Sequence, residues 1–164
     1  MASWRGGRPH GPLSVLGAGV VVAVVAIDQI AKAIAEATLP LGQMIDILPF
    51  LALYRVHNTG IAFSMFAGTG VPLIGLMLVV TAIVIAFWLQ SRDGGRLAAI
   101  GFALILGGAF GNLIDRVRLG FVVDFLLLHI GETTLFVFNL ADAALTLGPV
   151  VLLIVYLWPA MHEA

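Results

Sequence analysis

The chain has 164 residues, of which 61% are hydrophobic and 10% are charged, and its mean hydropathy is +1.11. A soluble domain of this size cannot cover that much apolar surface, so the composition predicts an integral membrane protein. The net charge of −1 excludes the basic field that holds nucleic acid phosphates, and the absence of cysteine excludes disulfides, thiolate metal sites and cysteine nucleophiles.

Four windows of the chain are long and apolar enough to cross a hydrocarbon core about 30 Å thick, which needs roughly 20 residues. We predict transmembrane helices over about residues 13–35, 70–90, 97–115 and 140–158. The first window has an alternative interpretation as a cleavable signal peptide, because two arginines precede it. Cleavage would discard Asp28 and Lys32, which have no use in the apolar part of a signal peptide, so an intact helix is simpler.

The connections between the windows indicate an orientation. The short loop SRDGGR, residues 91–96, carries Arg92 and Arg96, and the N-terminal tail carries two more arginines. The positive-inside rule therefore predicts that this loop and both termini are cytoplasmic. The longer connections, about 41–66 and 118–138, would lie outside, and their alternating, β-branched and aromatic stretches predict strands. We expect an all-α membrane protein of one domain, with four transmembrane helices and a small extracytoplasmic β-sheet subdomain.

Polar residues of the predicted helices gather at the outer ends. An ionised group in the bilayer costs several kcal/mol unless it is paired or hydrated, so such residues are candidates for function. They are Asp28 and Lys32 in the first window, Asn112, Asp115 and Arg116 in the third, and Asn139 and Asp142 in the fourth. The i,i+4 spacing of Asp28 and Lys32 favours a structural ion pair. Gly107 and Gly111 have the spacing that lets helices approach closely in lipid.

Two acidic residues, Asp124 and Asp142, reach the same outer boundary from different segments. Two carboxylates in an apolar site share a proton, so that one is ionised while the other is protonated. The ionised member can activate water against a peptide carbonyl, and the protonated member can donate to the carbonyl oxygen. This chemistry needs neither a metal nor a cofactor. The alternative for Asp142 is a buried residue at a helix start, and spacing alone does not bring the two carboxylates together.

Other functions are less consistent with the sequence. There is no HExxH motif and the histidines are scattered, so zinc is not expected, and Ser64 lacks a nucleophile-elbow context. A small ion or proton carrier is the main alternative, because intramembrane Asp and Arg also mark relays. The cytoplasmic halves of the predicted helices are almost uniformly apolar, which gives such a carrier no path. A scaffold without activity is a third alternative, in which both aspartates would be dispensable.

Five motifs in order resemble the lipoprotein signal peptidase family, also called signal peptidase II. They are DQIAK (Asp28–Lys32), NTGIAFS (Asn58–Ser64), GGAFGNLIDR (Gly107–Arg116), VVDF (Val122–Phe125) and FNLAD (Phe138–Asp142). The resemblance implies an intramembrane aspartic endopeptidase of the bacterial cytoplasmic membrane, with its active site near the outer face. It further implies a prolipoprotein substrate carrying diacylglycerol on a cysteine, cleavage immediately before that cysteine, and inhibition by globomycin-type compounds.

The resemblance also implies roles for single residues. Asp124 and Asp142 correspond to the catalytic pair. The residues implied to bind the substrate or to orient the pair are Asn58, Asn112, Arg116 and Asn139. The residues implied to support the site are Asp28, Lys32, Gly108 and Asp115. One departure from the family pattern is Ile61, which stands where a smaller residue is expected and would narrow the pocket slightly.

Overall fold

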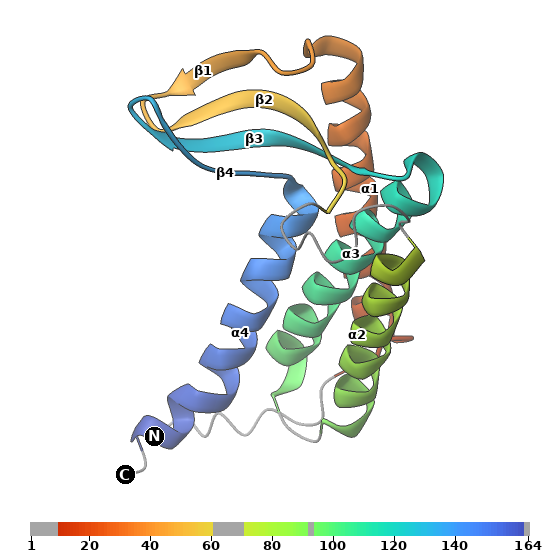
Figure 1. Ribbon diagram of the computed structural model, residues 1–164. Coiled ribbons are helices and arrows are strands. Elements are labelled where there is room, and N and C mark those ends of the chain that lie inside the picture. The colour runs from red at the N-terminus through yellow and green to blue at the C-terminus, as the bar shows by residue number, and fades with distance from the viewer. Residues whose placement is uncertain (1–9, 61–70, 92–93, 163–164) are drawn as a thin grey trace.

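The computed structural model describes residues 10–60, 71–91 and 94–162. In these ranges the chain forms four long helices and one four-stranded sheet, which lies at one end of the helical bundle (Figure 1). The helices are α1 (Val15–Thr38), α2 (Val71–Gln90), α3 (Gly95–Leu119) and α4 (Leu140–His162). The strands are β1 (Met44–Leu48), β2 (Leu51–Asn58), β3 (Val122–Ile130) and β4 (Thr133–Phe138).

The helix ends follow local capping chemistry. α1 begins after Ser14, whose hydroxyl accepts a backbone N–H of the first turn at 3.1 Å. α3 ends before Gly120, which adopts φ +82° and donates its N–H to the carbonyl of Arg116 at 3.1 Å. α3 therefore extends beyond the predicted window of 97–115, and its last turn carries two arginines, where the helix dipole favours cations. The four predicted helices are confirmed.

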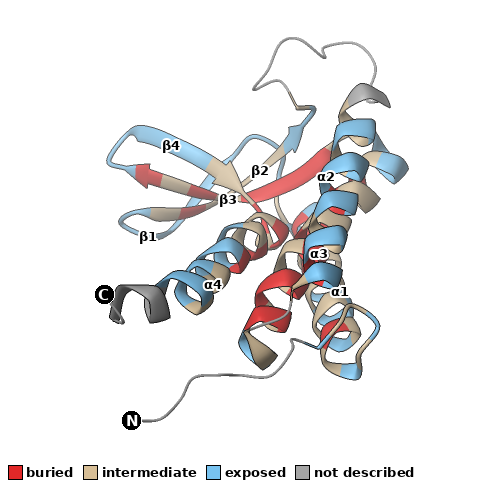
Figure 2. Ribbon diagram, turned by 90° about the horizontal axis from the view of Figure 1, so that it is seen from below, coloured by how far each residue is buried: buried red, intermediate tan, exposed pale blue. Residues whose placement is uncertain are grey.

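α3 is the central helix of the bundle. Of its apolar window 56% is buried, against 11–17% in the other three helices, and it contacts all of them. Figure 2 shows that the buried residues concentrate in α3 and β3. A Cβ atom added at Gly107 would lie 2.6 Å from Cβ of Val24, and one at Gly111 would lie 2.7 Å from Oδ2 of Asp28. The predicted close packing at these two glycines is therefore confirmed, and α1 is the helix that approaches.

The outward faces of the helices are apolar. Val22, Phe87, Leu89 and Leu153 are each more than half exposed. Water would penalise such a surface, whereas lipid tails accept it. All four helices are long and apolar enough to cross a membrane. The prediction of an all-α membrane protein with a small added sheet is confirmed.

The strands form one antiparallel sheet in the order β1-β2-β3-β4. The predicted β segments, 41–66 and 118–138, supply all of these strands. β3 is buried from Val122 to Phe125, whereas every residue of β1 is exposed. β3 follows α3 almost directly, and β4 leads into α4. The sheet therefore connects the ends of the two helices that carry most of the predicted site.

The pairing of β2 with β3 brings the end of β2 next to the start of β3, which comes between α3 and α4 in the chain. Val56 lies opposite Asp124, and Asn58 lies opposite Val122. The register shifts between Leu53 and Val56, so the pairing beside Asp124 is separate from the regular part of the strand. The end of β2 thus lies next to the part of β3 that carries the acidic residue.

Candidate active site

The start of α4 is closed by two reciprocal hydrogen bonds between Asn139 and Asp142. The Asn139 side-chain oxygen accepts the backbone N–H of Asp142 at 2.9 Å, and the Asp142 carboxylate accepts the backbone N–H of Asn139 at 3.2 Å. This is the geometry of a capping box, with Asp in place of the usual Glu. It fixes the Asp142 carboxylate at a helix N-terminus, where the helix dipole favours negative charge.

Asp124, on the buried part of β3, accepts two side-chain hydrogen bonds. Nδ2 of Asn139 donates to its Oδ1 at 2.6 Å, and Nδ2 of Asn58 donates to its Oδ2 at 2.9 Å. Asn139 therefore contacts both acidic residues, with its amide nitrogen on Asp124 and its amide oxygen on the backbone of Asp142. One fully buried amide thus bridges the two aspartates that the sequence placed at a common boundary.

Asn112 of α3 closes this arrangement into a ring. Its Nδ2 donates to Oδ1 of Asp142 at 2.7 Å, and its Oδ1 accepts from Nδ2 of Asn139 at 3.1 Å. The side chains of Asn112, Asp124, Asn139 and Asp142 are therefore joined by hydrogen bonds, and we call these four residues the ring. Each oxygen of Asp142 has a donor, one from a side chain and one from the backbone.

A buried ionic group lies beneath the ring. Lys32 of α1 contacts Asp28 at 2.8 Å and Asp115 at 2.9 Å, and all three side chains are no more than 3% exposed. The predicted pair of Asp28 and Lys32 is confirmed, while Asp115 is an additional partner. Within the described residues no group of three or more His, Cys, Asp or Glu side chains is placed to hold a metal ion. The ammonium of Lys32 is instead the cation that both carboxylates share.

Asp28 and Asp115 also hold backbone groups of neighbouring elements. Asp28 accepts the N–H of Ala141, in the first turn of α4, at 2.9 Å. Asp115 accepts the N–H of Val123, next to Asp124 in β3, at 3.1 Å. These two carboxylates therefore anchor the segments that carry the two acidic residues of the ring.

Two residues contribute to the site beyond their sequence-based roles. Gln29 of α1, which was not predicted, donates to Oδ1 of Asp115 at 2.8 Å and to the carbonyl of Gly111 at 3.2 Å. Its sequence signals were its position inside the DQIAK motif and its place in the polar group at the outer end of the predicted first helix. At Gly108 an added Cβ would press on the carbonyl of Ala141, so this glycine lets α3 approach α4. Ile61 and Ser64 lie outside the described residues.

The electrostatic environment of Asp124 differs from that of an ordinary aspartate. Burial raises the pKa of the Asp124 carboxyl from 3.8 to about 6, and the negative charge of Asp142 also raises it. The hydrogen bonds from Asn58 and Asn139 and the charge of Lys32 act in the opposite direction. Asp124 is therefore the carboxyl group that retains a proton near neutral pH more readily than an ordinary aspartate.

Arg116 lies half-buried in the last turn of α3. The carboxylates of Asp124, Asp142 and Asp115 act on its guanidinium electrostatically. Within the described part of the chain no hydrogen bond or ion pair of the Arg116 guanidinium is found, although the backbone carbonyl of Arg116 accepts from Gly120. Its fork of N–H groups is therefore available beside the two aspartates, where it suits a carbonyl or ester oxygen.

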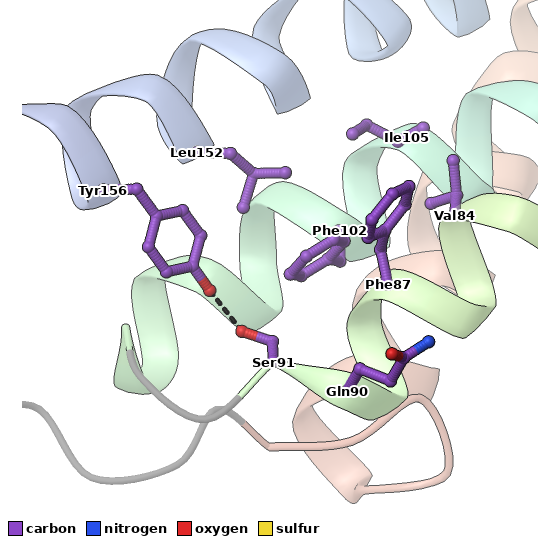
Figure 3. Close-up of a pocket in the computed structure, with 8 residues that line it drawn as sticks. All are labelled: Val84, Phe87, Gln90, Ser91, Phe102, Ile105, Leu152 and Tyr156. Atoms are coloured by element: carbon purple, nitrogen blue, oxygen red, sulfur yellow. Dashed lines mark hydrogen bonds between the residues drawn. The ribbon is translucent and has the colours of Figure 1, made fainter.

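A separate cleft of about 480 Å³ lies between α2, α3 and α4, toward the end of the bundle away from the sheet (Figure 3). Its walls are apolar side chains such as Phe87, Phe102 and Leu152. The hydroxyl groups of Ser91 and Tyr156 are hydrogen-bonded to each other at one side. Among the described residues that line this cleft there is no Asp, Glu, His, Lys or Arg, whereas the site of Asp124 and Asp142 holds two carboxyl groups.

Comparison with known proteins identifies the family. The family model described as signal peptidase (SPase) II matches residues 20–158. The chain is also 50% identical over 130 residues to the lipoprotein signal peptidases of Brucella ovis and Brucella abortus, covering 79% of this chain and 81% of each relative. The chain belongs to the signal peptidase II family. The resemblance seen in the five motifs is thereby confirmed.

Solved structures agree with this assignment to the signal peptidase II family. A bacterial membrane enzyme determined by the in meso method at 2.3 Å resolution superposes with a TM-score of 0.80 and 26% identity, covering 97% of this chain and 96% of that one. A second, at 1.9 Å resolution, gives a TM-score of 0.76 and 29% identity, covering 84% and 90%. The similarity includes the sheet as well as the helices, since it extends over almost the whole chain.

Proposed function

We propose that this member of the signal peptidase II family removes signal peptides from diacylglyceryl-modified prolipoproteins, cutting before the lipidated cysteine, with Asp124 and Asp142 as its catalytic dyad. The observation that carries the proposal is the single buried amide of Asn139, which contacts both aspartates. Two carboxyl groups held in one hydrogen-bonded ring, in different environments, are suited to acid and base roles in one reaction.

The environments assign the two roles. Asp142 receives an N–H on each oxygen and lies at a helix N-terminus, so it is the ionised base. Asp124, whose pKa burial raises to about 6, is the protonated acid. Asp142 takes a proton from a water molecule as the water oxygen bonds to the scissile carbonyl carbon, while Asp124 donates its proton to the carbonyl oxygen. The C–N bond then breaks. Asp142 gives the proton that it took from water to the amine of the lipidated cysteine, which leaves, and Asp124 takes back a proton from a hydroxyl group of the intermediate as the new carboxyl group forms.

The position of the ring suits a substrate dissolved in lipid. A diacylglyceryl chain stays in the bilayer, so the site must open sideways between apolar helices rather than into a water-filled cleft. The ring lies where α3, α4 and the sheet meet, and the helices that contribute to the site carry exposed apolar residues such as Ile30, Val117 and Leu147. Arg116 and Asn58 are the polar groups at its edge that we assign to the substrate carbonyl and ester oxygens. A globomycin-type inhibitor would occupy the same place.

We further propose a location in the bacterial cytoplasmic membrane, with both termini cytoplasmic and the sheet outside. Arg96 at the start of α3, and the arginines of the N-terminal tail and the loop, support this orientation by the positive-inside rule. The described polar network stays at the sheet end of the bundle, and α2 has no charged residue from Val71 to Gln90. These features give no path for an ion or proton carrier.

Incubation of the purified full chain with a diacylglyceryl prolipoprotein tests this function. Mass spectrometry should show one new product whose N-terminus is the lipidated cysteine, and a globomycin-type inhibitor should prevent its formation. The same precursor without diacylglycerol is the matched control and should remain uncut. Cleavage at another bond, or equal cleavage of both precursors, would contradict the proposed substrate class.

A further inference from the structure

We infer that Lys32 is a positioning residue for the dyad: its ammonium holds the amide oxygen of Asn112, which turns the amide nitrogen of Asn112 toward Asp142 and keeps Asp142 the ionised member. This inference rests on the proposed function, because it concerns the same dyad. It goes beyond the ion pair expected from the i,i+4 spacing of Asp28 and Lys32. A simple ion pair within α1 would balance two buried charges without affecting chemistry on another helix.

The hydrogen bonds of Lys32 are saturated. A lysine ammonium has three N–H donors and no acceptor. Here they meet Asp28 Oδ2 at 2.8 Å, Asp115 Oδ2 at 2.9 Å and Asn112 Oδ1 at 2.9 Å. The third contact is unnecessary for balancing charge, since the two carboxylates already exceed the charge of the lysine. Its effect is on the orientation of Asn112.

An asparagine side chain can be turned by 180° about its last bond with little change in shape, so its neighbours decide which end faces which way. Lys32 and Asn139 both direct donors at one end of the Asn112 amide. Only oxygen can accept them. The nitrogen must then face Asp142, where it donates at 2.7 Å. In the reverse orientation an amide N–H₂ would face an ammonium, and an amide oxygen would face a carboxylate.

This orientation makes the two aspartates unequal. The donor to Asp142 comes from a buried asparagine that is itself fixed by a buried cation. The matching donor to Asp124 Oδ2 comes from Asn58, an exposed residue at the end of β2. Asp124 can therefore release Asn58 and turn toward a substrate oxygen, whereas Asp142 cannot leave its donors. The charged groups around the dyad are Asp28 and Lys32 from α1, and Asp115 and Arg116 from α3.

The test compares two variants that both lack the Asp28 carboxylate and differ only in whether the Lys32 ammonium is present. Asp28→Asn alone keeps the contact between Lys32 and Asn112. The double variant Asp28→Asn, Lys32→Met removes one carboxylate and the ammonium together, so the net charge of the buried group is that of the wild type. We expect both to insert and to unfold within a few degrees of each other. We expect the kcat of the double variant to be about 10²-fold lower than that of Asp28→Asn, with a similar KM. A factor of this size is at the low end of the contributions made by acid–base catalysis. Equal kcat values would overturn the inference.

A second measurement separates positioning from support. If Lys32 acts through Asn112, then Lys32→Met should add little to the loss caused by Asn112→Ala. Independent structural effects would multiply instead. Both single variants should keep a KM near the wild-type value, so that the loss lies in kcat. A lysine that only supports the fold would give a loss that is independent of the loss at Asn112.

Lys32→Arg tests the inference if the methionine variants do not fold. Arginine keeps a cation between Asp28 and Asp115, but its planar fork cannot reproduce the three directions of an ammonium. We expect a folded protein with kcat reduced by about tenfold at similar KM. A wild-type kcat in this variant would overturn the inference. Activity in Asp124→Asn or Asp142→Asn would contradict the proposed function itself, which no result with Lys32 variants alone would do.

Discussion

Asn139 gives the sharpest separation of stability from activity. Its side chain is fully buried; it caps α4 through the N–H of Asp142 and donates to Asp124 at 2.6 Å. Loss of a helix cap costs about 1 kcal/mol, and loss of a hydrogen bond between neutral groups costs about 0.5–1.5 kcal/mol. Asn139→Ala removes both interactions, so we expect it to lower the free energy of unfolding by about 1.5–2.5 kcal/mol.

Asn139→Ser separates the helix cap from the hydrogen bond to Asp124. Serine is as good a helix cap as asparagine, but it is too short to bridge to Asp124. We expect this variant to be about 1 kcal/mol more stable than Asn139→Ala, yet to lose activity to the same extent, by about 10²-fold or more. Thermal unfolding in detergent and initial rates on a lipidated precursor measure the two quantities.

Ser14→Ala is the matched control for the cap. It removes the hydrogen bond that closes the start of α1, at 3.1 Å, without touching the dyad. It should cost about 1 kcal/mol of stability and leave kcat unchanged. The reasoning would be refuted if Asn139→Ser retained the activity of the wild type, because the amide bridge would then be irrelevant to catalysis.

The remaining predictions concern protons and packing. The folded-state pKa of Asp124 is about 6, which is above the ordinary value of 3.8. The protonated Asp124 therefore contributes its full stabilisation below pH 3.8, and this contribution is lost as the pH rises through 6. Unfolding temperatures measured from pH 4 to pH 7 should show this decline, and Asp124→Asn should abolish it. The alkaline limb of the kcat/KM profile should lie at about pH 6 or above, well outside the ordinary aspartate range, and a limb near pH 4 would contradict the assigned acid. Gly111→Ala places a Cβ 2.7 Å from Oδ2 of Asp28 and should cost about 1–3 kcal/mol, whereas Gly75→Ala, with nothing within 4 Å, should be neutral or stabilising in the same unfolding assay.

The sequence predicted the parts of this protein that depend on local patterns. Apolar runs of sufficient length predicted the four helices, because a bilayer requires that length regardless of tertiary packing. Alternating and β-branched stretches predicted the sheet, and the i,i+4 spacing predicted the contact of Asp28 with Lys32. Gly107 and Gly111 indicated a close helix approach. The helix that approaches, α1, could not be named from their spacing.

The hydrogen-bonded ring could not be predicted from patterns. The contacts of Asn139 with Asp124 and of Asn112 with Asp142 join segments far apart in the chain, and an amide has the same outline in both orientations. Only the approach of Lys32 and the capping of α4 decide which end donates. Asp115 was predicted as a supporting residue by resemblance, but its bond to the N–H of Val123 depends on how β3 leaves α3. Gln29 escaped prediction for the same reason.

The central claim is that Asp124 and Asp142 together activate water. The most direct measurement is the single-turnover rate of cleavage of a diacylglyceryl prolipoprotein by Asp124→Asn and Asp142→Asn, each shown to be folded and inserted. Asp46→Asn is the matched control, because it makes the same change on a carboxylate that is 64% exposed, on β1. We predict a loss of at least about 10⁴-fold for each dyad variant and a wild-type rate for the control. Turnover within tenfold of the wild type by either dyad variant would contradict the claim.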